Sequence, residues 1–220
     1  MMKVIITGAT GMVGEGVLLE CLQNPAVSEV LIVNRKHYEA THPKLKELIV
    51  PDLFDIGNYK DQLASYDACF FCAGVSSVGM KEPDYTRVTH DLTLNFARTL
   101  AAINTHMVFT YVSGASTDST EQGKIMWARV KGRTENDLLK LHFKKVYNFR
   151  PGAMKPTEGQ ISIKPLYKAI SFLFPVLKFL FPGSTSTVQA VGVAMINSVL
   201  KGYDKTILEV NDIKALAGIA

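Results

Sequence analysis

The spacing of glycines near the N-terminus constrains this chain more than any other feature. The segment Thr7-Gly8-Ala9-Thr10-Gly11-Met12-Val13-Gly14 follows an apolar run and opens a helical pattern, so its glycines fall as GxxGxxG. In such a strand–turn–helix, the first glycine permits a tight turn, the second lets a pyrophosphate approach the backbone, and the third lets the helix pack on the strand. Free amides and the helix dipole then hold the anion. The pattern predicts dinucleotide contacts from Gly8, Thr10, Gly11, Met12, Val13 and Gly14.

Apolar runs alternate with helical patterns along most of the chain. The expected strands are residues 3–7, 29–34, 48–50, 67–72, 107–112 and 145–149, and the expected helices are 12–23, 58–65, 83–103 and 121–141. Continuous apolar strands that alternate with helices indicate a parallel sheet covered on both faces. The prediction is an α/β, Rossmann-type, doubly wound parallel sheet with strand order 3-2-1-4-5-6.

The regular alternation stops after Arg150-Pro151-Gly152. We expect a loop over 153–162, an apolar and aromatic stretch with spaced lysines over 164–181, a helix over 187–200 and a last strand over 206–210. A chain of 220 residues suffices for one substantial core. We therefore expect a single domain over 1–220, in which residues 156–220 form a small helical extension on the substrate side.

Composition excludes several classes of protein. The net charge of +4 is small and scattered, which argues against a nucleic-acid partner. The sparse cysteines, Cys21, Cys69 and Cys72, suggest reduced thiols and a cytoplasmic location. Cys69 and Cys72 lie in a run that reads as a buried strand, so we expect a core role and no metal site. No apolar stretch is long enough to predict a transmembrane span.

The residues after the second strand indicate which cofactor is preferred. An acidic residue there normally holds a free ribose 2′-hydroxyl. The segment Val33-Asn34-Arg35-Lys36 has no acid, and Arg35 could grip a 2′-phosphate with Lys36 adding charge. The alternative is that both are solvated surface cations. The segment favours NADP, with NAD possible.

The TGATGxxG turn resembles the extended or atypical branch of the short-chain dehydrogenase/reductase superfamily. Over residues 3–155 the chain is similar to bacterial proteins of the NAD-dependent epimerase/dehydratase or NAD(P)H-binding type, and to the Tat-interacting protein group. The resemblance implies an adenine contact at Asp52-Leu53, a cofactor-ribose contact at Cys72-Ala73-Gly74, and a nicotinamide-flanking turn at Pro151-Gly152. Asp52 could instead cap the following turn.

The resemblance also places an active site on this chain. It implies an active-site Ser113 after the fifth strand and a cofactor-binding Lys131 in a later helix. The family's general acid, the tyrosine of Tyr-x-x-x-Lys, is missing: Trp127 stands there, in Trp-Ala-Arg-Val-Lys. An indole N–H donates only and cannot shuttle a proton. Trp127 could line the pocket or pack in the core, Ser113 could only bond locally, and Lys131 could be an exposed helix lysine.

Other residues could supply the missing proton. The sequence leaves open a displaced tyrosine (Tyr85, Tyr111 or Tyr147), His90 or a water, and it leaves Ser116 as a second candidate for holding the substrate oxygen. Residues 164–182 could line an apolar substrate cavity, form a dimer face, touch a membrane surface weakly, or pack in the core.

Two hypotheses of function remain. In the first, the protein is an NADP(H)-dependent oxidoreductase acting on a small apolar carbonyl or alcohol, in which the protein positions the cofactor and polarises the substrate. Epimerisation of a sugar nucleotide is a weaker variant, because it needs the missing tyrosine and a larger C-terminal region. In the second, the protein is a non-catalytic redox sensor or assembly partner that binds a dinucleotide.

Overall fold

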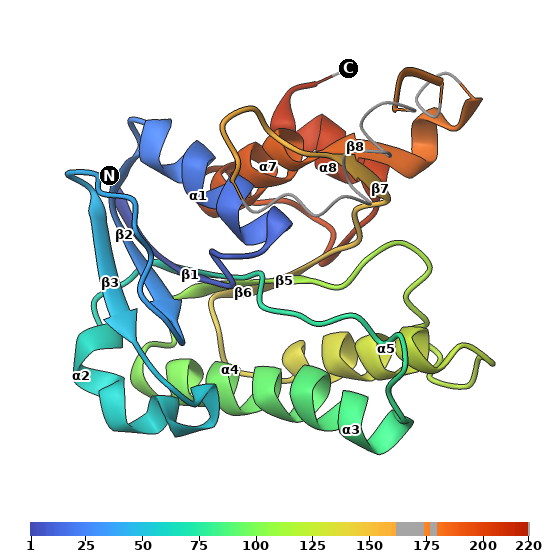
Figure 1. Ribbon diagram of the computed structural model, residues 1–220, viewed down its shortest axis with the longest axis horizontal. Helices are drawn as coiled ribbons and strands as arrows, with labels where there is room; N and C mark the ends of the chain where they lie inside the picture. The colour runs from blue at the N-terminus through green and yellow to red at the C-terminus, as the bar shows by residue number, and fades with distance from the viewer. Residues whose placement is uncertain (162–173, 177–179, 220) are drawn as a thin grey trace.

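The computed structural model describes residues 1–161, 174–176 and 180–219. Figure 1 shows a central sheet with helices on both faces. The strands of this sheet are β1 (Met2–Thr7), β2 (Val27–Asn34), β3 (Leu45–Ile49), β4 (Ala68–Phe71), β5 (Val108–Val112), β6 (Lys145–Phe149) and β9 (Ile207–Leu208). All pair in parallel, in the order β3-β2-β1-β4-β5-β6-β9. The predicted Rossmann-type sheet is confirmed, and β9 extends it beyond β6.

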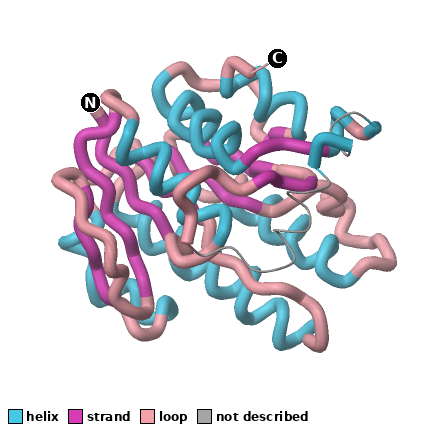
Figure 2. Tube along the Cα trace, turned by 45° about the horizontal axis from the view of Figure 1, so that its top comes forward, coloured by secondary structure: helices cyan, strands magenta, loops and turns pink. Residues whose placement is uncertain are grey.

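Helices form one layer on each face of the sheet (Figures 1 and 2). The first layer holds α1 (Met12–Gln23), α7 (Val188–Leu200) and α8 (Val210–Ala217), and the second holds α2 (Lys60–Leu63), α3 (Glu82–Thr86), α4 (Leu92–Ile103) and α5 (Met126–Leu138). Successive strand residues point to opposite faces, so Val4 and Ile6 join one core while Ile5 joins the other. Both faces of the strands are therefore buried.

Two helices differ from their predicted bounds. The expected helix over 83–103 is continuous but contains a π-helical segment, η2 (Arg87–Asp91), between α3 and α4. The expected helix over 121–141 begins only at Met126. Glu121 has a left-handed φ of 62°, and the Asp118 carboxylate accepts from the amides of Thr120 and Gly123. This local network holds a loop where helical periodicity alone predicts helix.

The helix expected over 58–65 is shorter than predicted, because only α2 is α-helical there. The 3-10 helix η1 (Leu53–Tyr59) directly precedes it. The loop expected over 153–162 contains β7 (Ala153–Lys155), which pairs in parallel with β8 (Thr185–Thr187). The 3-10 helix η3 (Pro182–Ser184) leads into β8. Most of the stretch expected to be apolar over 164–181 lies outside the described residues.

The C-terminal helices complete the first layer. Helix α7 begins at Val188, where the Thr187 hydroxyl caps it by accepting from Ala190 N at 3.0 Å. It lies so close to α1 that a Cβ on Gly16 would stand 2.2 Å from Val188 Cγ1. The sequence did not predict α8, which carries a capping box formed by Glu209 and Asp212.

Candidate functional site

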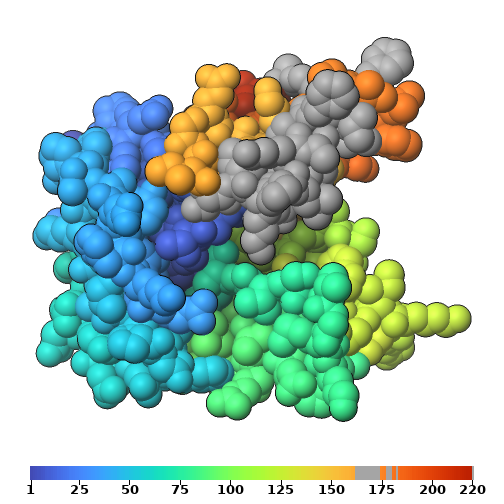
Figure 3. All heavy atoms as spheres, in the orientation of Figure 1, coloured from blue at the N-terminus to red at the C-terminus, as the bar shows by residue number. Residues whose placement is uncertain are grey.

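A cleft of about 580 Å³ lies at the carboxyl ends of β1, β2 and β4. This is the crevice at which the strand order reverses, where ligands of doubly wound folds bind. In Figure 3 the surface is hollowed where dark-blue N-terminal atoms show between light-blue and green ones. The cleft is lined by Gly8, Thr10, Gly11, Val33, Asn34, Arg35, Pro51, Asp52, Leu53, Phe54, Cys72, Ala73, Gly74, Val75, Arg87, Val88 and Leu92. Nine predicted cofactor contacts are among them.

The three glycines of the turn, Gly8, Gly11 and Gly14, differ in what an added Cβ atom would contact. Gly8 has φ +71°, and a Cβ there would stand 2.7 Å from Ala73 N. A Cβ on Gly14 would stand 2.1 Å from Gly8 O. A Cβ on Gly11 would meet nothing closer than Gly8 O at 3.4 Å, and Gly11 has φ −102° and ψ 160°. The chain itself needs glycine at 8 and 14, whereas at 11 a side chain would only fill the cleft.

Helix α1 points its N-terminal end at this cleft. Gly11 is the N-cap and provides no side-chain cap. Within the described residues, no acceptor is recorded for the amides of Met12 and Val13. These donors and the positive end of the helix dipole suit an anion.

Two arginines, Arg35 and Arg87, line the cleft. Arg35 lines the cleft, whereas the neighbouring Lys36 is exposed and does not. Asp52 lines it too, but its carboxylate also caps η1 by accepting from Phe54 N at 3.0 Å. Sequence reasoning missed Arg87, whose guanidinium lies 5.8 Å from the centroid of the Phe54 ring. Nothing in the local sequence identifies Arg87, because the approach of η2 to η1 brings it there.

Two of the three predicted catalytic residues, Ser113 and Lys131, meet at the carboxyl end of β5, the strand next to β4. Neither they nor Trp127 are among the residues that line the cleft. The Lys131 ammonium, from α5, donates a hydrogen bond to the main-chain carbonyl of Ser113. The Ser113 hydroxyl is buried and bonds to the Glu135 carboxylate, with Phe149 O at 3.1 Å. Trp127 is half-buried in the first turn of α5, one turn before Lys131. The structure thus brings Ser113 and Lys131 together, with the Ser113 hydroxyl turned toward Glu135.

A buried ion pair between Glu135 and Arg150 lies beside Ser113. Glu135 is fully buried, and Arg150 Nε donates to its Oε1 at 3.0 Å while Nη2 contacts its Oε2. The Arg150 guanidinium also reaches Glu209 Oε1 at 3.1 Å and Ser119 Oγ at 2.5 Å. Sequence reasoning missed Glu135, although its position one turn after Lys131 is a signal that could have found it.

Burial changes the proton affinity of Lys131. Desolvation lowers the pKa of its ammonium to about 8, and the negative charge of Glu135 opposes that shift. Lys131 is therefore a cation that can release a proton near neutral pH.

The other candidate proton donors lie away from the cleft. Both His90 ring nitrogens face carboxylates, with Nδ1 at 2.8 Å from Asp91 and Nε2 at 2.9 Å from Asp137. Tyr85 and Tyr111 are buried, and burial raises the pKa of each phenol. None of these side chains lines the cleft.

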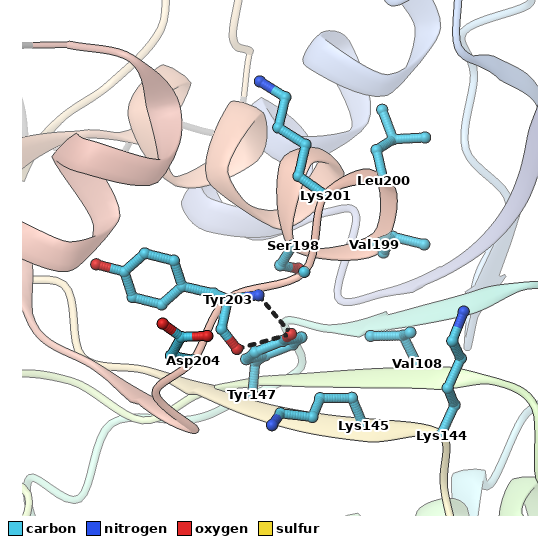
Figure 4. Close-up of a pocket in the computed structure, with 11 residues that line it drawn as sticks. Val108, Lys144, Lys145, Tyr147, Ser198, Val199, Leu200, Lys201, Tyr203 and Asp204 are labelled. Atoms are coloured by element: carbon cyan, nitrogen blue, oxygen red, sulfur yellow. Dashed lines mark hydrogen bonds between the residues drawn. The ribbon is translucent and has the colours of Figure 1, made fainter.

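Tyr147 lines a second hollow of about 620 Å³ at the amino ends of β5 and β6, opposite the carboxyl ends where the cleft lies (Figure 4). Its hydroxyl accepts from Tyr203 N at 2.9 Å and donates to Tyr203 O at 3.3 Å. The ammonium groups of Lys144, Lys145 and Lys201 point in different directions there.

The remaining predicted positions have structural contacts. Pro151 O accepts from Ala115 N at 3.0 Å, and a Cβ on Gly152 would stand 2.0 Å from Ser184 O. Neither residue lines the cleft. Ser116 is exposed and has φ 65°.

The cysteines are free thiols. Cys69 is buried and Cys72 half-buried, and burial raises the pKa of Cys72 to about 12. Among the described residues, no cluster of three potential metal ligands occurs, and none of their helices is long and apolar enough to cross a membrane. The surface role predicted for 164–182 falls largely outside the described residues.

Comparisons with known proteins agree with this architecture. A family model described as the NAD dependent epimerase/dehydratase family matches residues 4–125. Protein fmp52, mitochondrial, of Aspergillus fumigatus is 26% identical over 215 residues, covering 93% of this chain and 89% of the relative. Protein HTATIP2 of Rattus norvegicus is 26% identical over 155 residues, covering 69% and 62%. These matches confirm the resemblance predicted from the sequence.

Among solved structures, the Bordetella bronchiseptica enzyme WbmF in complex with NAD+ superposes with a TM-score of 0.68 at 14% identity, over 99% of this chain and 78% of that one. This likeness shows the fold. One prediction is corrected here: the cytoplasmic location expected from the cysteines is wrong, because the Aspergillus relative is named as mitochondrial. Reduced thiols report the redox state of a compartment and do not distinguish among reducing compartments.

Proposed function

The chain belongs to the NAD-dependent epimerase/dehydratase family, and on that premise we propose that it binds NADP(H) and interconverts a small apolar carbonyl with its alcohol. The fold it carries is the dinucleotide-binding fold of that family. The observation that supports the proposal most is the open space at Gly11. Its Cβ would be accommodated by the chain, so the missing side chain serves a ligand in the cleft.

Residues along the cleft suit the parts of a dinucleotide in order. Helix α1 begins at the cleft, where Gly11 is its N-cap, and its first amides suit a pyrophosphate. Asp52 and Leu53 border one end, where an adenine would lie. At the other end lie Cys72, Ala73 and Gly74, which follow β4, the neighbour of β5, and Ser113 directly follows β5. The nicotinamide would then lie beside Lys131.

The preference for a 2′-phosphate rests on charge. Arg35 lines the cleft directly after β2, and no carboxylate stands at the end of that strand to take a 2′-hydroxyl. Glu47, on the neighbouring strand, is engaged by Tyr38 N at 2.8 Å and by His37. Arg87 adds a second cation to the cleft wall. These features favour NADP(H) over NAD(H).

A bound nicotinamide would supply hydride transfer, and the protein's residues would position the reactants. The ammonium of Lys131 is the group suited to hold the nicotinamide ribose. The half-buried Trp127 provides an apolar surface one turn away. That surface suits a small apolar substrate.

One observation favours a second candidate, a protein that binds the dinucleotide without turnover. Trp127 stands where the family has its tyrosine, and the structure brings no other tyrosine of the described residues to the cleft. Two measurements on the purified protein separate the candidates: calorimetric titration with NADPH, and NADPH oxidation with a panel of apolar aldehydes and ketones. Binding with turnover supports the oxidoreductase. Binding without turnover on any member supports the sensor or assembly partner, and no binding contradicts both.

A further inference from the structure

We propose that the Lys131 ammonium itself passes the proton to the substrate oxygen, in place of the tyrosine that Trp127 replaces. The proposal rests on the oxidoreductase function proposed above. It assigns to this lysine a second role besides holding the cofactor.

The Ser113 hydroxyl is the first alternative proton donor. The Ser113 hydroxyl has one hydrogen, and its two close partners, the Glu135 carboxylate and Phe149 O, are both acceptors. The hydrogen is therefore used inside the protein. Ser113 can accept a hydrogen bond from the substrate side, but it cannot give a proton to an oxygen there.

The other alternative proton donors are His90, Tyr147 and Trp127. His90 is held between the carboxylates of Asp91 and Asp137, so both of its ring nitrogens are engaged within the protein. The hydroxyl of Tyr147 is bound to the Tyr203 backbone at the opposite edge of the sheet. Trp127 offers only an indole N–H, which does not ionise in the usable range.

The position of Lys131 favours it as the proton donor. Its ammonium bonds to Ser113 O at the carboxyl end of β5. Strand β5 pairs with β4, and the residues just after β4, Cys72 to Val75, line the cleft. The nitrogen therefore lies one strand from the cleft. An ammonium has three N–H donors, and the Ser113 carbonyl uses one of them.

The surroundings of Lys131 make it a usable acid. Glu135 stands one turn further on α5, and Arg150 from the end of β6 neutralises it. The phenol of Tyr111 lies near Glu135 and that of Tyr85 near Tyr111, and burial raises the pKa of both, so they stay neutral. Burial lowers the pKa of Lys131 to about 8. A group with a pKa near the working pH is the most effective proton donor.

A bound dihydronicotinamide would supply the hydride to the carbonyl carbon, and the C=O π pair would then become the oxygen lone pair that takes the proton from Lys131. An N–H bond of Lys131 breaks and an O–H bond forms, which yields the alcohol and a neutral Lys131 amine. The amine then takes a proton from water.

The first test needs no turnover. The unliganded protein is labelled with trace acetic anhydride between pH 6.5 and 11, and the acetylation of each lysine is quantified by peptide mass spectrometry, with the exposed Lys124 as the reference. We expect the titration of Lys131 labelling to be centred near pH 8. If the Lys131 labelling shows no inflection near pH 8, the assignment is overturned, whatever the protein catalyses.

The second test compares carbonyl reduction by the wild type, Lys131→Arg and the control Lys124→Arg. The wild-type and control kcat/KM should fall by about tenfold per pH unit above the Lys131 pKa, as the acid is lost. Lys131→Arg keeps the charge but does not release a proton, so its kcat should be lower by about 10²- to 10⁴-fold. Because Lys131 is also the residue suited to hold the nicotinamide ribose, kcat is compared at saturating NADPH.

The outcomes separate the two proposals. Turnover by Lys131→Arg with the wild-type rate and pH profile overturns the assignment alone. Absence of wild-type turnover on every carbonyl overturns the oxidoreductase proposal and this assignment with it. If Lys131→Arg fails to fold, as judged by its thermal unfolding, Lys131→Met replaces it, and retention of wild-type kcat by that variant overturns the assignment.

Discussion

The ammonium of Lys131 donates a hydrogen bond to the main-chain carbonyl of Ser113 and so ties α5 to the carboxyl end of β5. The ammonium is part-buried there, and desolvation lowers its pKa to about 8. A cation kept in such a site lowers the stability of the folded chain, because the unfolded chain solvates it fully.

This relationship predicts a pH dependence of stability. Below pH 8 Lys131 is charged in both states, so the full cost is present. As pH rises from about 8 toward 10.5, the folded state loses the proton first, and the unfolding free energy of the wild type rises relative to that of Lys131→Met. The change in that difference should be at most roughly 3 kcal/mol. Urea unfolding at pH 7 and pH 10 measures it, and parallel stabilities across this range would show that Lys131 is not desolvated.

The buried Glu135–Arg150 pair predicts an asymmetry between two similar substitutions. Glu135→Gln leaves the Arg150 guanidinium without its buried counter-charge, which costs about 3–5 kcal/mol. Glu209→Gln removes the other partner of Arg150, whose side chain is 53% exposed, and should cost under about 1 kcal/mol. Denaturant midpoints of the two variants compare them directly. Equal losses would contradict the placement of Glu135 as the buried anchor.

Arg35 predicts the cofactor preference. Arg35→Ala should weaken NADPH binding by about 1.5–3 kcal/mol and leave NADH nearly unchanged, because only NADPH has a 2′-phosphate. Lys36→Ala is the matched control, since Lys36 is exposed and lies outside the cleft lining. Calorimetric titrations with both cofactors measure the effects, and an equal loss for NADPH and NADH in Arg35→Ala would mean that Arg35 does not contact that phosphate.

Trp127 is the only tryptophan, so its fluorescence tests whether it lies at the nicotinamide end. It lies one helical turn from Lys131, so NADPH should quench its fluorescence by energy transfer to the reduced ring. Trp127→Phe should keep measurable turnover if Lys131 is the acid, and Trp127→Tyr should raise it. Binding detected by calorimetry without a change in tryptophan emission would place Trp127 away from the nicotinamide.

The sheet and its strand order could be predicted because their causes are local. The Gly8–Gly14 turn and the apolar strands indicate both the topology and the place where a phosphate would bind. The start of α5 could not be predicted, because the Asp118 carboxylate and the left-handed Glu121 override helical periodicity. Helix α8 escaped prediction because it is short and follows a strand of two residues.

The structure places the predicted Ser113 and Lys131 in contact, but the residues that support them could not be predicted. The positions of Lys131 and Ser113 follow from motif spacing. The contacts of Glu135 with Arg150, and of Arg87 with Phe54, join residues that are distant in sequence. Nothing in the sequence showed that the Ser113 hydroxyl would turn to Glu135, because that depends on burial of the ion pair.

Binding of the dinucleotide against Gly11 is the central claim, and Gly11→Val tests it most directly. The extended backbone at this position, with φ −102° and ψ 160°, accepts a β-branched residue, and the nearest atom to a new Cβ is 3.4 Å away. Calorimetric titration with NADPH should show one site per wild-type chain and no measurable binding to Gly11→Val, while the variant keeps its wild-type thermal unfolding temperature. Wild-type affinity in a folded Gly11→Val protein would contradict the account.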